Sequence, residues 1–342
     1  MTLTVREGEP VRFSLASLSP LPAGLLAHTR HVIGREFENV EERSPRVDGV
    51  HALTFLGHLR RSSGGVRGDD DVQIGAVSQD DVTDNSSDTS PRVPTQVGSA
   101  ADLQAVVDEL RGPALALGMS CAFITGEIAV DGPRLIVSDV DSTFIRDEVI
   151  EMIAAAADVE DHVREITERA MRGELDFAES LRERVACVEG VPTSMFADVA
   201  GRVTVTPGAG KLVDATHTRG GKFGLVSGGF HEVVDRFAAP FGVDGILANR
   251  FNTADGQLTG TVDGEIIDRE VKARTLIEWA EQFDVPVELT AAMGDGANDL
   301  AMMDVAGLSV AFCAKPIVLA TADAIVTQPS MEIVIALLGW DD

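Results

Sequence analysis

Positively charged residues are scarce in this sequence of 342 residues. Lys and Arg number 28 against 55 Asp and Glu, which gives a formal net charge of −27. A chain with this balance is not expected to bind nucleic acid or an anionic membrane. An anionic ligand would have to be attracted by local cations or by a bound metal ion, because the overall field repels it.

Cysteine and long apolar runs are also scarce. Cys121, Cys187 and Cys313 lie far apart with no C-x-x-C spacing, which fits core thiols in a reducing cytoplasm. The N-terminal residues lack the basic start and apolar run of a secretory signal, and no segment reaches the roughly 20 apolar residues of a membrane span. We therefore expect a cytoplasmic protein, and the length and the 44% hydrophobic content suit about two globular domains.

The segment LIVSDVDST at residues 135–143 places two carboxylates directly after an apolar run. The run has the pattern of a buried parallel strand, and ligands of open α/β sheets bind beyond the carboxyl ends of such strands. Asp139 and Asp141 would supply the hard oxygen ligands that Mg²⁺ prefers, while water and a substrate phosphate complete the coordination. The alternative is a turn in which the two aspartates make only local hydrogen bonds.

Two later apolar runs also end in polar loops. In KFGLVSGGF at 222–230, Ser227 and the amides that follow it could hold a phosphate at the start of the next helix. GDGAND at 294–299 follows an apolar stretch and precedes LAMM. Its glycines let the backbone approach an ion closely, and its acids add oxygen ligands.

Lys272 lies between these two loops, at the start of an expected helix. Alone it would be a solvated surface charge, just as each loop alone would be an ordinary turn. The four features together, in this order along the chain, are not expected by coincidence and indicate a phosphate and metal site.

From about Pro133 to Asp342 the chain resembles the haloacid dehalogenase superfamily, and within it the phosphoserine phosphatases. DVDST, SGGF, Lys272 and GDGANDL are similar to the four motifs of the superfamily, in the same order. The segment 165–185 resembles the cap of that subfamily, and AFCAKP at 311–316 resembles a segment near its end. The resemblance implies an α/β fold with a doubly wound parallel sheet and a small helical cap inserted at about residues 147–206.

The resemblance also implies roles for the acidic motif residues. Asp139 would attack phosphorus and form an aspartyl phosphate, which splits one difficult hydrolysis into two easier steps. Asp141 would protonate the leaving oxygen and later accept a proton from the attacking water. The Asp139 and Asp295 carboxylates and the backbone carbonyl of Asp141 would hold Mg²⁺.

Substrate contacts are implied at both ends of the site. At the phosphate end they come from Ser227, Gly228, Lys272 and Asn298, with Asp299 holding Lys272 in place. In the cap, Arg184 would bind the carboxylate of an amino-acid phosphate, because a guanidinium matches a carboxylate in a bidentate pair. Glu148 would bind the ammonium group. Without the resemblance, both charged residues would be interpreted as solvated helix faces.

The N-terminal part has fewer signals. Apolar residues at helical spacing predict a helix within 21–40, and Val50–Leu56 and Cys121–Ile124 have strand patterns. A capping box at 99–102 predicts the start of a second helix. Polar residues and few large apolar ones predict a disordered acidic insertion at 62–98.

Without that insertion, residues 1–130 predict a small α+β domain similar to the amino-acid-binding ACT domains. It would precede a phosphatase domain at 131–342. The role of this N-terminal domain stays open. It could be regulatory, or it could be structural or form a homodimer. A separate signal, DGQLTG at 255–260, predicts a hairpin turn beside the site.

The resemblance implies Mg²⁺-dependent hydrolysis of O-phospho-L-serine to L-serine and phosphate, the last step of serine biosynthesis in this family. A related alternative is a phosphatase or phosphotransferase that acts on another small amino-acid phosphate, such as phosphohomoserine. A third alternative, from a different class, is a non-catalytic amino-acid sensor. The intact set of Asp139, Asp141, Lys272 and Asp295 counts against the sensor.

Overall fold

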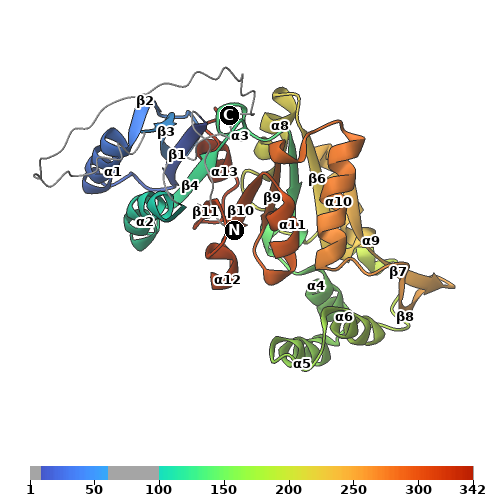
Figure 1. The fold of residues 1–342 in the computed structure, drawn as a ribbon. Helices are drawn as coiled ribbons and strands as arrows, with labels where there is room; N and C mark the ends of the chain where they lie inside the picture. Colours follow the sequence, from blue (N-terminus) through green and yellow to red (C-terminus); the bar gives the residue numbers. More distant parts are fainter. Residues whose placement is uncertain (1–8, 61–99, 342) are drawn as a thin grey trace, which may run out of the picture.

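One sheet of 11 strands runs through the described part of the chain. The computed structural model describes residues 9–60 and 100–341, and the insertion expected at 62–98 lies outside them. The strand order is β2-β3-β1-β4-β11-β10-β9-β5-β6-β7-β8 (Figure 1). In the described residues no helix is long and apolar enough to cross a membrane.

Six central strands are parallel and carry helices on both faces. They are β5 (Leu135–Ser138), β6 (Lys222–Phe230), β7 (Gly245–Ala254), β9 (Thr290–Gly294), β10 (Leu308–Phe312) and β11 (Ala324–Val326). Every residue of β5, β9 and β10 is buried, as a parallel strand covered on both faces requires. Helices α8 (Ala209–Thr218) and α9 (His231–Ala238) cover one face, while α10 (Arg269–Gln282) and α11 (Leu300–Val305) cover the other (Figure 1).

The chain winds in two directions from the centre of this sheet. From β5 it proceeds to β6 and β7 on one side, and from β9 it proceeds to β10 and β11 on the other. This arrangement confirms the predicted doubly wound core. It places the topological switch point between β5 and β9, where ligands of such sheets bind beyond the carboxyl ends of the strands.

Four short helices form a cap between β5 and α8. They are α4 (Val149–Ala156), α5 (Glu160–Met171), α6 (Phe177–Ala186) and α7 (Met195–Ala200). The chain enters and leaves the cap through two antiparallel segments, joined by a bridge between Ile145 and Val205 and by the hydrogen bond from Thr206 N to Phe144 O, 3.0 Å. The cap lies beyond one edge of the sheet, below it in Figure 1.

A hairpin formed by β7 and β8 (Gln257–Asp263) projects beside the cap (Figure 1). Its two turn residues, Asp255 and Gly256, have φ of 51° and 77°. Positive φ at both positions suits the right-handed twist of the two strands, and Asp-Gly is a preferred pair there. The hairpin predicted at 255–260 is confirmed.

The N-terminal elements have the order βαββαβ. They are β1 (Pro10–Ser17), α1 (Ala23–Glu36), β2 (Phe37–Arg43), β3 (His51–Leu59), α2 (Ala100–Ala116) and β4 (Ser120–Thr125). The order is that of the split βαβ motif. The likeness to ACT domains and the boundary near residue 130 stay predictions.

The first helix is shorter than its apolar spacing predicts. It ends at Glu36, and the chain continues directly as β2, which pairs with β3. Phe37 keeps its apolar role, since it is buried, but the backbone after it bonds to β3 instead of extending the helix. The helix predicted within 21–40 is present, and strand pairing with a distant segment ends it at Glu36.

The two halves of the sheet join edge to edge. Strand β4 pairs with β11 in antiparallel orientation, at Ala122 with Ala324 and at Cys121 with Ile325. Three short helices complete the described chain: α3 (Ile128–Asp131), α12 (Pro316–Leu319) and α13 (Glu332–Leu337). The buried Arg12 side chain connects β1 to α3 by donating from Nε to the carbonyl of Ala129, 2.7 Å away.

Candidate active site

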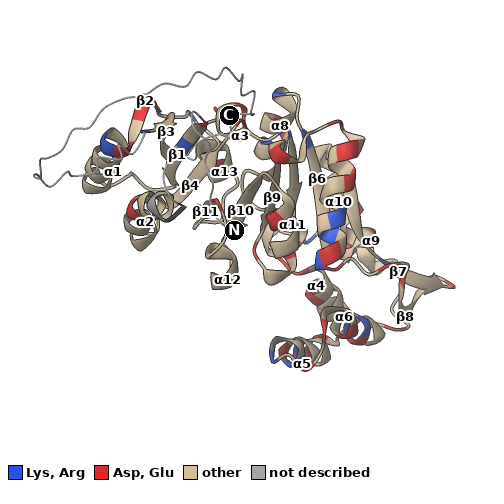
Figure 2. Cartoon of the chain, in the orientation of Figure 1, with Lys and Arg blue, Asp and Glu red and all other residues tan. Residues whose placement is uncertain are grey.

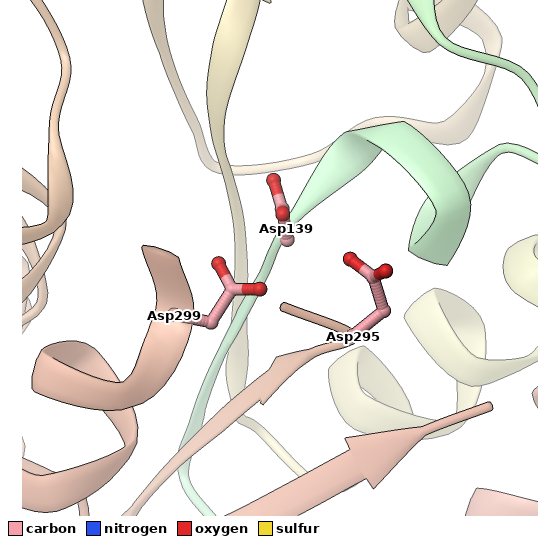
Figure 3. A group of neighbouring side chains, drawn as sticks. All are labelled: Asp139, Asp295 and Asp299. Carbon is pink, nitrogen blue, oxygen red and sulfur yellow. The ribbon is translucent and has the colours of Figure 1, made fainter. Parts of the chain in front are cut away.

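Three carboxylates converge where β5 and β9 end. Asp139 follows β5, while Asp295 and Asp299 belong to the loop between β9 and α11. One oxygen from each lies within 4.8 Å of the others, and Figure 3 shows the three side chains pointing toward a common space. The switch point of the sheet therefore carries the acidic cluster that the sequence predicted there.

A buried lysine bridges two of these carboxylates. Lys272 Nζ lies 2.8 Å from Asp139 Oδ1 and 2.8 Å from Asp299 Oδ1, and its side chain is 1% exposed. Burial acts to lower the pKa of Lys272, but the two adjacent carboxylates raise it above its usual value. Lys272 is therefore a permanent buried cation at the start of α10, where Asp268 caps the helix.

Negative charge is in excess in this cluster. Burial, and next the charge of Asp299, raise the pKa of Asp139 well above its usual range, although Lys272 opposes them. Burial also raises the pKa of Asp295. Three carboxylates around one buried ammonium leave an excess of negative charge, which a hard divalent cation with oxygen ligands would offset. The donor set therefore fits a divalent metal ion.

Asp141 lies beside this cluster but is held by a different set of groups. Its Oδ1 accepts the backbone N–H of Val149 at 2.6 Å, and its Oδ2 accepts the Ser227 hydroxyl at 3.0 Å. Burial first, and the charge of Glu148 second, raise the pKa of Asp141 to about 7, while these two hydrogen bonds oppose the shift. A carboxyl group with a pKa near 7 can both donate and accept a proton at neutral pH.

The loop after Val226 brings its backbone close to Asp141. Gly229 N donates to Ser227 Oγ at 2.8 Å. A Cβ on Gly229 would lie 2.9 Å from that oxygen and 3.0 Å from Asp141 Oδ2. Only glycine therefore allows this approach, which explains part of the SGGF motif.

The cap supplies a cation and an anion to the same space. Glu148 Oε1 accepts the Ser142 hydroxyl at 2.8 Å, and Ser142 has a positive φ of 56°. Arg184 Nε donates to the carbonyl of Ser180 one turn earlier in α6, at 3.2 Å. Burial lowers the pKa of Arg184, which remains a cation because its ordinary pKa is so high.

A cavity of about 170 Å³ connects these groups. The predicted residues that line it are Asp139, Asp141, Glu148, Arg184, Gly228, Asp295 and Asn298. The other three predicted residues, Ser227, Lys272 and Asp299, are buried and bond to lining residues. A larger cavity of about 480 Å³ lies between α10 and α11, but none of the predicted site residues lines it.

Four further residues line the cavity, namely Ile150, Phe177, Gly229 and Lys315. Of these, Phe177 and Lys315 contact the predicted loops but received no role from the sequence. The Phe177 ring lies over the glycine loop, 3.1 Å from where a Cβ on Gly228 would be. Lys315 Nζ lies 3.7 Å from Asp295 Oδ2, and the Lys315 backbone N–H donates to the Asp295 carbonyl at 2.9 Å. Both residues stand in segments that resemble the family, so position within those segments was the available signal.

Local cations matter here because the chain as a whole is acidic. Figure 2 shows Asp and Glu spread over the described chain, with Lys and Arg scattered among them. Arg184 and Lys315 line the cavity directly, and Lys272 lies behind it. These three cations offset the field of the chain at the point where an anionic ligand would bind.

Comparisons with known proteins show which family the chain belongs to. The family of haloacid dehalogenase-like hydrolases matches residues 136–304. A phosphoserine phosphatase of Streptococcus thermophilus is 51% identical over 204 residues, which are 60% of this chain and 95% of that protein. One of Streptomyces coelicolor is 45% identical over 241 residues, 70% of this chain and 59% of that protein.

Solved structures give the same answer. A substrate-bound phosphoserine phosphatase complex has a TM-score of 0.56 at 38% identity, covering 59% of this chain and 97% of that one. A probable phosphoserine phosphatase of Vibrio cholerae has a TM-score of 0.66 at 28% identity, covering 99% of this chain and 89% of that one. The chain therefore belongs to the haloacid dehalogenase-like hydrolases and, within them, to the phosphoserine phosphatase family.

Proposed function

We propose that the protein hydrolyses O-phospho-L-serine to L-serine and inorganic phosphate. The observation that carries this proposal is one small cavity lined by two core carboxylates, Asp139 and Asp141, and by two charged cap residues, Glu148 and Arg184. We assign the phosphate to the first pair and the amino-acid group to the second. The names of the relatives support the same substrate.

The two oxygens of Asp139 are held differently, which indicates the attacking atom. Oδ1 accepts the backbone N–H of Val140 at 2.7 Å and lies 2.8 Å from Lys272 Nζ. Oδ2 accepts only a longer bond, from Asn298 Nδ2 at 3.3 Å. Oδ2 is the less constrained oxygen, so we assign it the attack on phosphorus. Because Asn298 bonds to this oxygen, its side chain would also contact the substrate phosphate.

The reaction proceeds in two displacements. Asp139 Oδ2 bonds to phosphorus while the bond from phosphorus to the serine oxygen breaks, and Asp141 gives that oxygen its proton. Water then attacks the aspartyl phosphate, Asp141 takes a proton from the water, and Asp139 and phosphate are released. Lys272 and Ser227 offset charge on the phosphoryl oxygens in both steps.

The divalent ion of this site is proposed to be Mg²⁺. Asp139, Asp295 and the backbone carbonyl of Asp141 would hold it, and Asp299 would support the site through Lys272. When bound, Mg²⁺ neutralises charge on the transferring phosphoryl group and orients it.

Recognition of the amino-acid end is assigned to the cap. Arg184 would pair with the substrate carboxylate, and Glu148 with its ammonium group. The small cavity favours a short amino-acid phosphate, although phosphohomoserine differs by only one methylene and stays the second candidate. The cytoplasm is the proposed location, in line with three free cysteines. We keep a homodimer through the N-terminal elements as a further proposal.

Phosphate release from a panel of monoesters tests this function. The panel contains O-phospho-L-serine, its D enantiomer, phosphohomoserine and an aryl phosphate, each with Mg²⁺ and with excess chelator. We expect the highest kcat/KM for O-phospho-L-serine and none with chelator. The Asp139→Asn variant, purified identically, measures contaminating phosphatase. If another monoester has the highest kcat/KM, that monoester becomes the proposed substrate. If phosphate is released from none of them, the result favours a non-catalytic sensor.

A further inference from the structure

Asn249 occupies the place where the ladder between β6 and β7 is interrupted. Val226 pairs with Leu247, and the next pair is Phe230 with Asn249, so residues 227–229 bulge out of the ladder. The backbone groups of this bulge cannot all find partners in β7. Asn249 is 1% exposed and pairs with Phe230, the first residue after the bulge.

The side-chain amide of Asn249 connects two of the loops that build the site. Its Nδ2 donates to the Gly228 carbonyl at 2.9 Å, and its Oδ1 accepts the Ile267 N–H at 3.0 Å. Ile267 directly precedes Asp268, which caps the helix that carries Lys272. One carbonyl acceptor and one N–H donor face the amide, so only a group that both donates and accepts satisfies them.

The bond to Gly228 continues toward the acid. The Gly228 carbonyl and the Gly229 N–H belong to one planar peptide, so fixing the first fixes the second. Gly229 N–H donates to Ser227 Oγ, and Ser227 Oγ donates to Asp141 Oδ2. The donors in this series all point the same way, from Ile267 to Asp141, and hydrogen bonds in such a series strengthen one another.

We propose that Asn249 is a positioning residue of the phosphoryl-transfer site, whose amide fixes the peptide of Gly228 and Gly229 so that the Ser227 hydroxyl faces both Asp141 and the substrate phosphate. Asn249 touches none of the reacting groups itself and acts through Ser227. The proposal rests on the proposed function for its activity measurements. It differs from a purely structural role, in which Asn249 would only satisfy buried backbone groups.

A double-mutant cycle between Asn249 and Ser227 tests the proposal. The isosteric variant Asn249→Asp keeps the acceptor for Ile267 but loses the amide donor to Gly228. We expect its kcat/KM to fall about 10- to 100-fold, as for a small displacement of a reacting group. In a Ser227→Ala background, Asn249→Asp should lower kcat/KM by less than about threefold further. The reason is that the effects of residues that act through one another are not additive.

Two measurements keep the result interpretable. Asn252→Asp removes another amide of β7, one that bonds to Thr261 Oγ1 and the Val262 carbonyl within the hairpin, and it should stay within about twofold of the parent. The cycle is run with O-phospho-L-serine and with an aryl phosphate. A parent that cleaves only the aryl phosphate would refute the proposed substrate while leaving the cycle readable.

Three results of the activity measurements would overturn the role of Asn249. The first is that the losses of kcat/KM from Asn249→Asp and Ser227→Ala multiply in the double variant. The second is that Asn249→Asp stays within about twofold of the parent. The third is that Asn252→Asp loses as much kcat/KM as Asn249→Asp. If Asn249→Asp and Asn249→Ala both lose cooperative melting, the residue is structural and the proposal is also wrong. Non-additive losses with parent-like melting would support it.

Discussion

Asp141 Oδ1 accepts the backbone N–H of Val149, the first residue of the first cap helix, at 2.6 Å. The proposed acid is thus bonded to the cap as well as to the core, where Ser227 holds its other oxygen. The geometry of proton transfer therefore depends on how the cap is seated. Glu148, the proposed contact of the substrate ammonium group, is the N-cap residue of the same helix, so the proposed acid and one proposed specificity residue share this helix start.

The pH dependence of turnover should follow Asp141. Its pKa is raised to about 7, so the protonated form needed to donate to the leaving oxygen declines above that pH. We expect kcat for O-phospho-L-serine to fall about tenfold per pH unit well above pH 7. An aryl phosphate, whose leaving oxygen needs no proton, should fall less. Identical pH profiles of kcat for the two substrates would contradict the assignment.

The raised pKa of Asp141 also predicts how the stability of the protein, measured with chelator present to remove metal, depends on pH. The ordinary pKa of 3.8 applies to the unfolded chain, and the folded value is about 7. The folded state therefore binds more protons between these values, and the stabilisation present below pH 4 is lost as pH rises through about 7. The melting temperature should fall more between pH 5 and pH 8 for the parent than for Asp141→Asn. An equal fall would remove Asp141 from the explanation.

Removing the nucleophile should abolish turnover without unfolding the protein. Asp139→Asn keeps the shape of the side chain but removes the attacking charge, so kcat should fall at least roughly 10³-fold. Asp304→Asn, a change of an exposed carboxyl group on α11, should stay within about twofold. Steady-state rates and thermal melts of both variants provide the measurement. Near-parental turnover by Asp139→Asn would exclude an aspartyl phosphate on this residue.

Metal removal should affect both activity and stability. Chelator should abolish turnover and Mg²⁺ should restore it, whereas Ca²⁺ should support turnover poorly because its larger and looser coordination shell misplaces the phosphate. Added Mg²⁺ should also raise the melting temperature, because a ligand of the folded state stabilises it by mass action. Asp295→Asn should remove most of this rise. Full activity in excess chelator would refute the proposed ligands.

The parts of the structure that the sequence predicted are those with local signals. Strand β5 and the loop after it were predicted from an apolar run followed by Asp139, and the hairpin from Asp255 and Gly256. Strand β2 was missed because its residues are mostly exposed, and its pairing with β3 depends on a distant segment. Contacts such as that of Asp141 with Ser227, 86 residues apart, needed the fold itself.

Within the site, the motif residues were predictable and their supports were not. The carboxylate cluster followed from motif order and from the rule that parallel strands end at one edge. Lys315 was marked only by its place in the AFCAKP segment, which suggested no contact for it. Asn249 carries no distinctive spacing, and an asparagine in a strand gave no reason for a role. Their importance follows from what they contact, which is Asp295 for the first and Gly228 for the second.

Arg184 and Arg182 offer the sharpest test of specificity, because both lie on α6 but only Arg184 lines the cavity. Arg182 is exposed and lines a separate groove against the β8 hairpin. Arg184→Ala would remove the proposed bidentate contact to the substrate carboxylate, and a loss of this kind costs roughly 2–4 kcal/mol, or on the order of 30- to 1,000-fold in kcat/KM.

That loss should be confined to substrates with a carboxylate. The aryl phosphate lacks one, so its kcat/KM on Arg184→Ala should stay within about tenfold of the parent, provided that the cap still closes. Arg182→Ala should leave both substrates within about twofold, because it removes a solvated charge of the same helix. The measurement is kcat/KM for both substrates on the parent and both variants. Equal losses for the two substrates would make Arg184 a support of cap closure, and unchanged values would make it a solvated charge. Either result would remove the main residue-level argument for an amino-acid phosphate, because Glu148 alone recognises an ammonium group and not the carboxylate beside it.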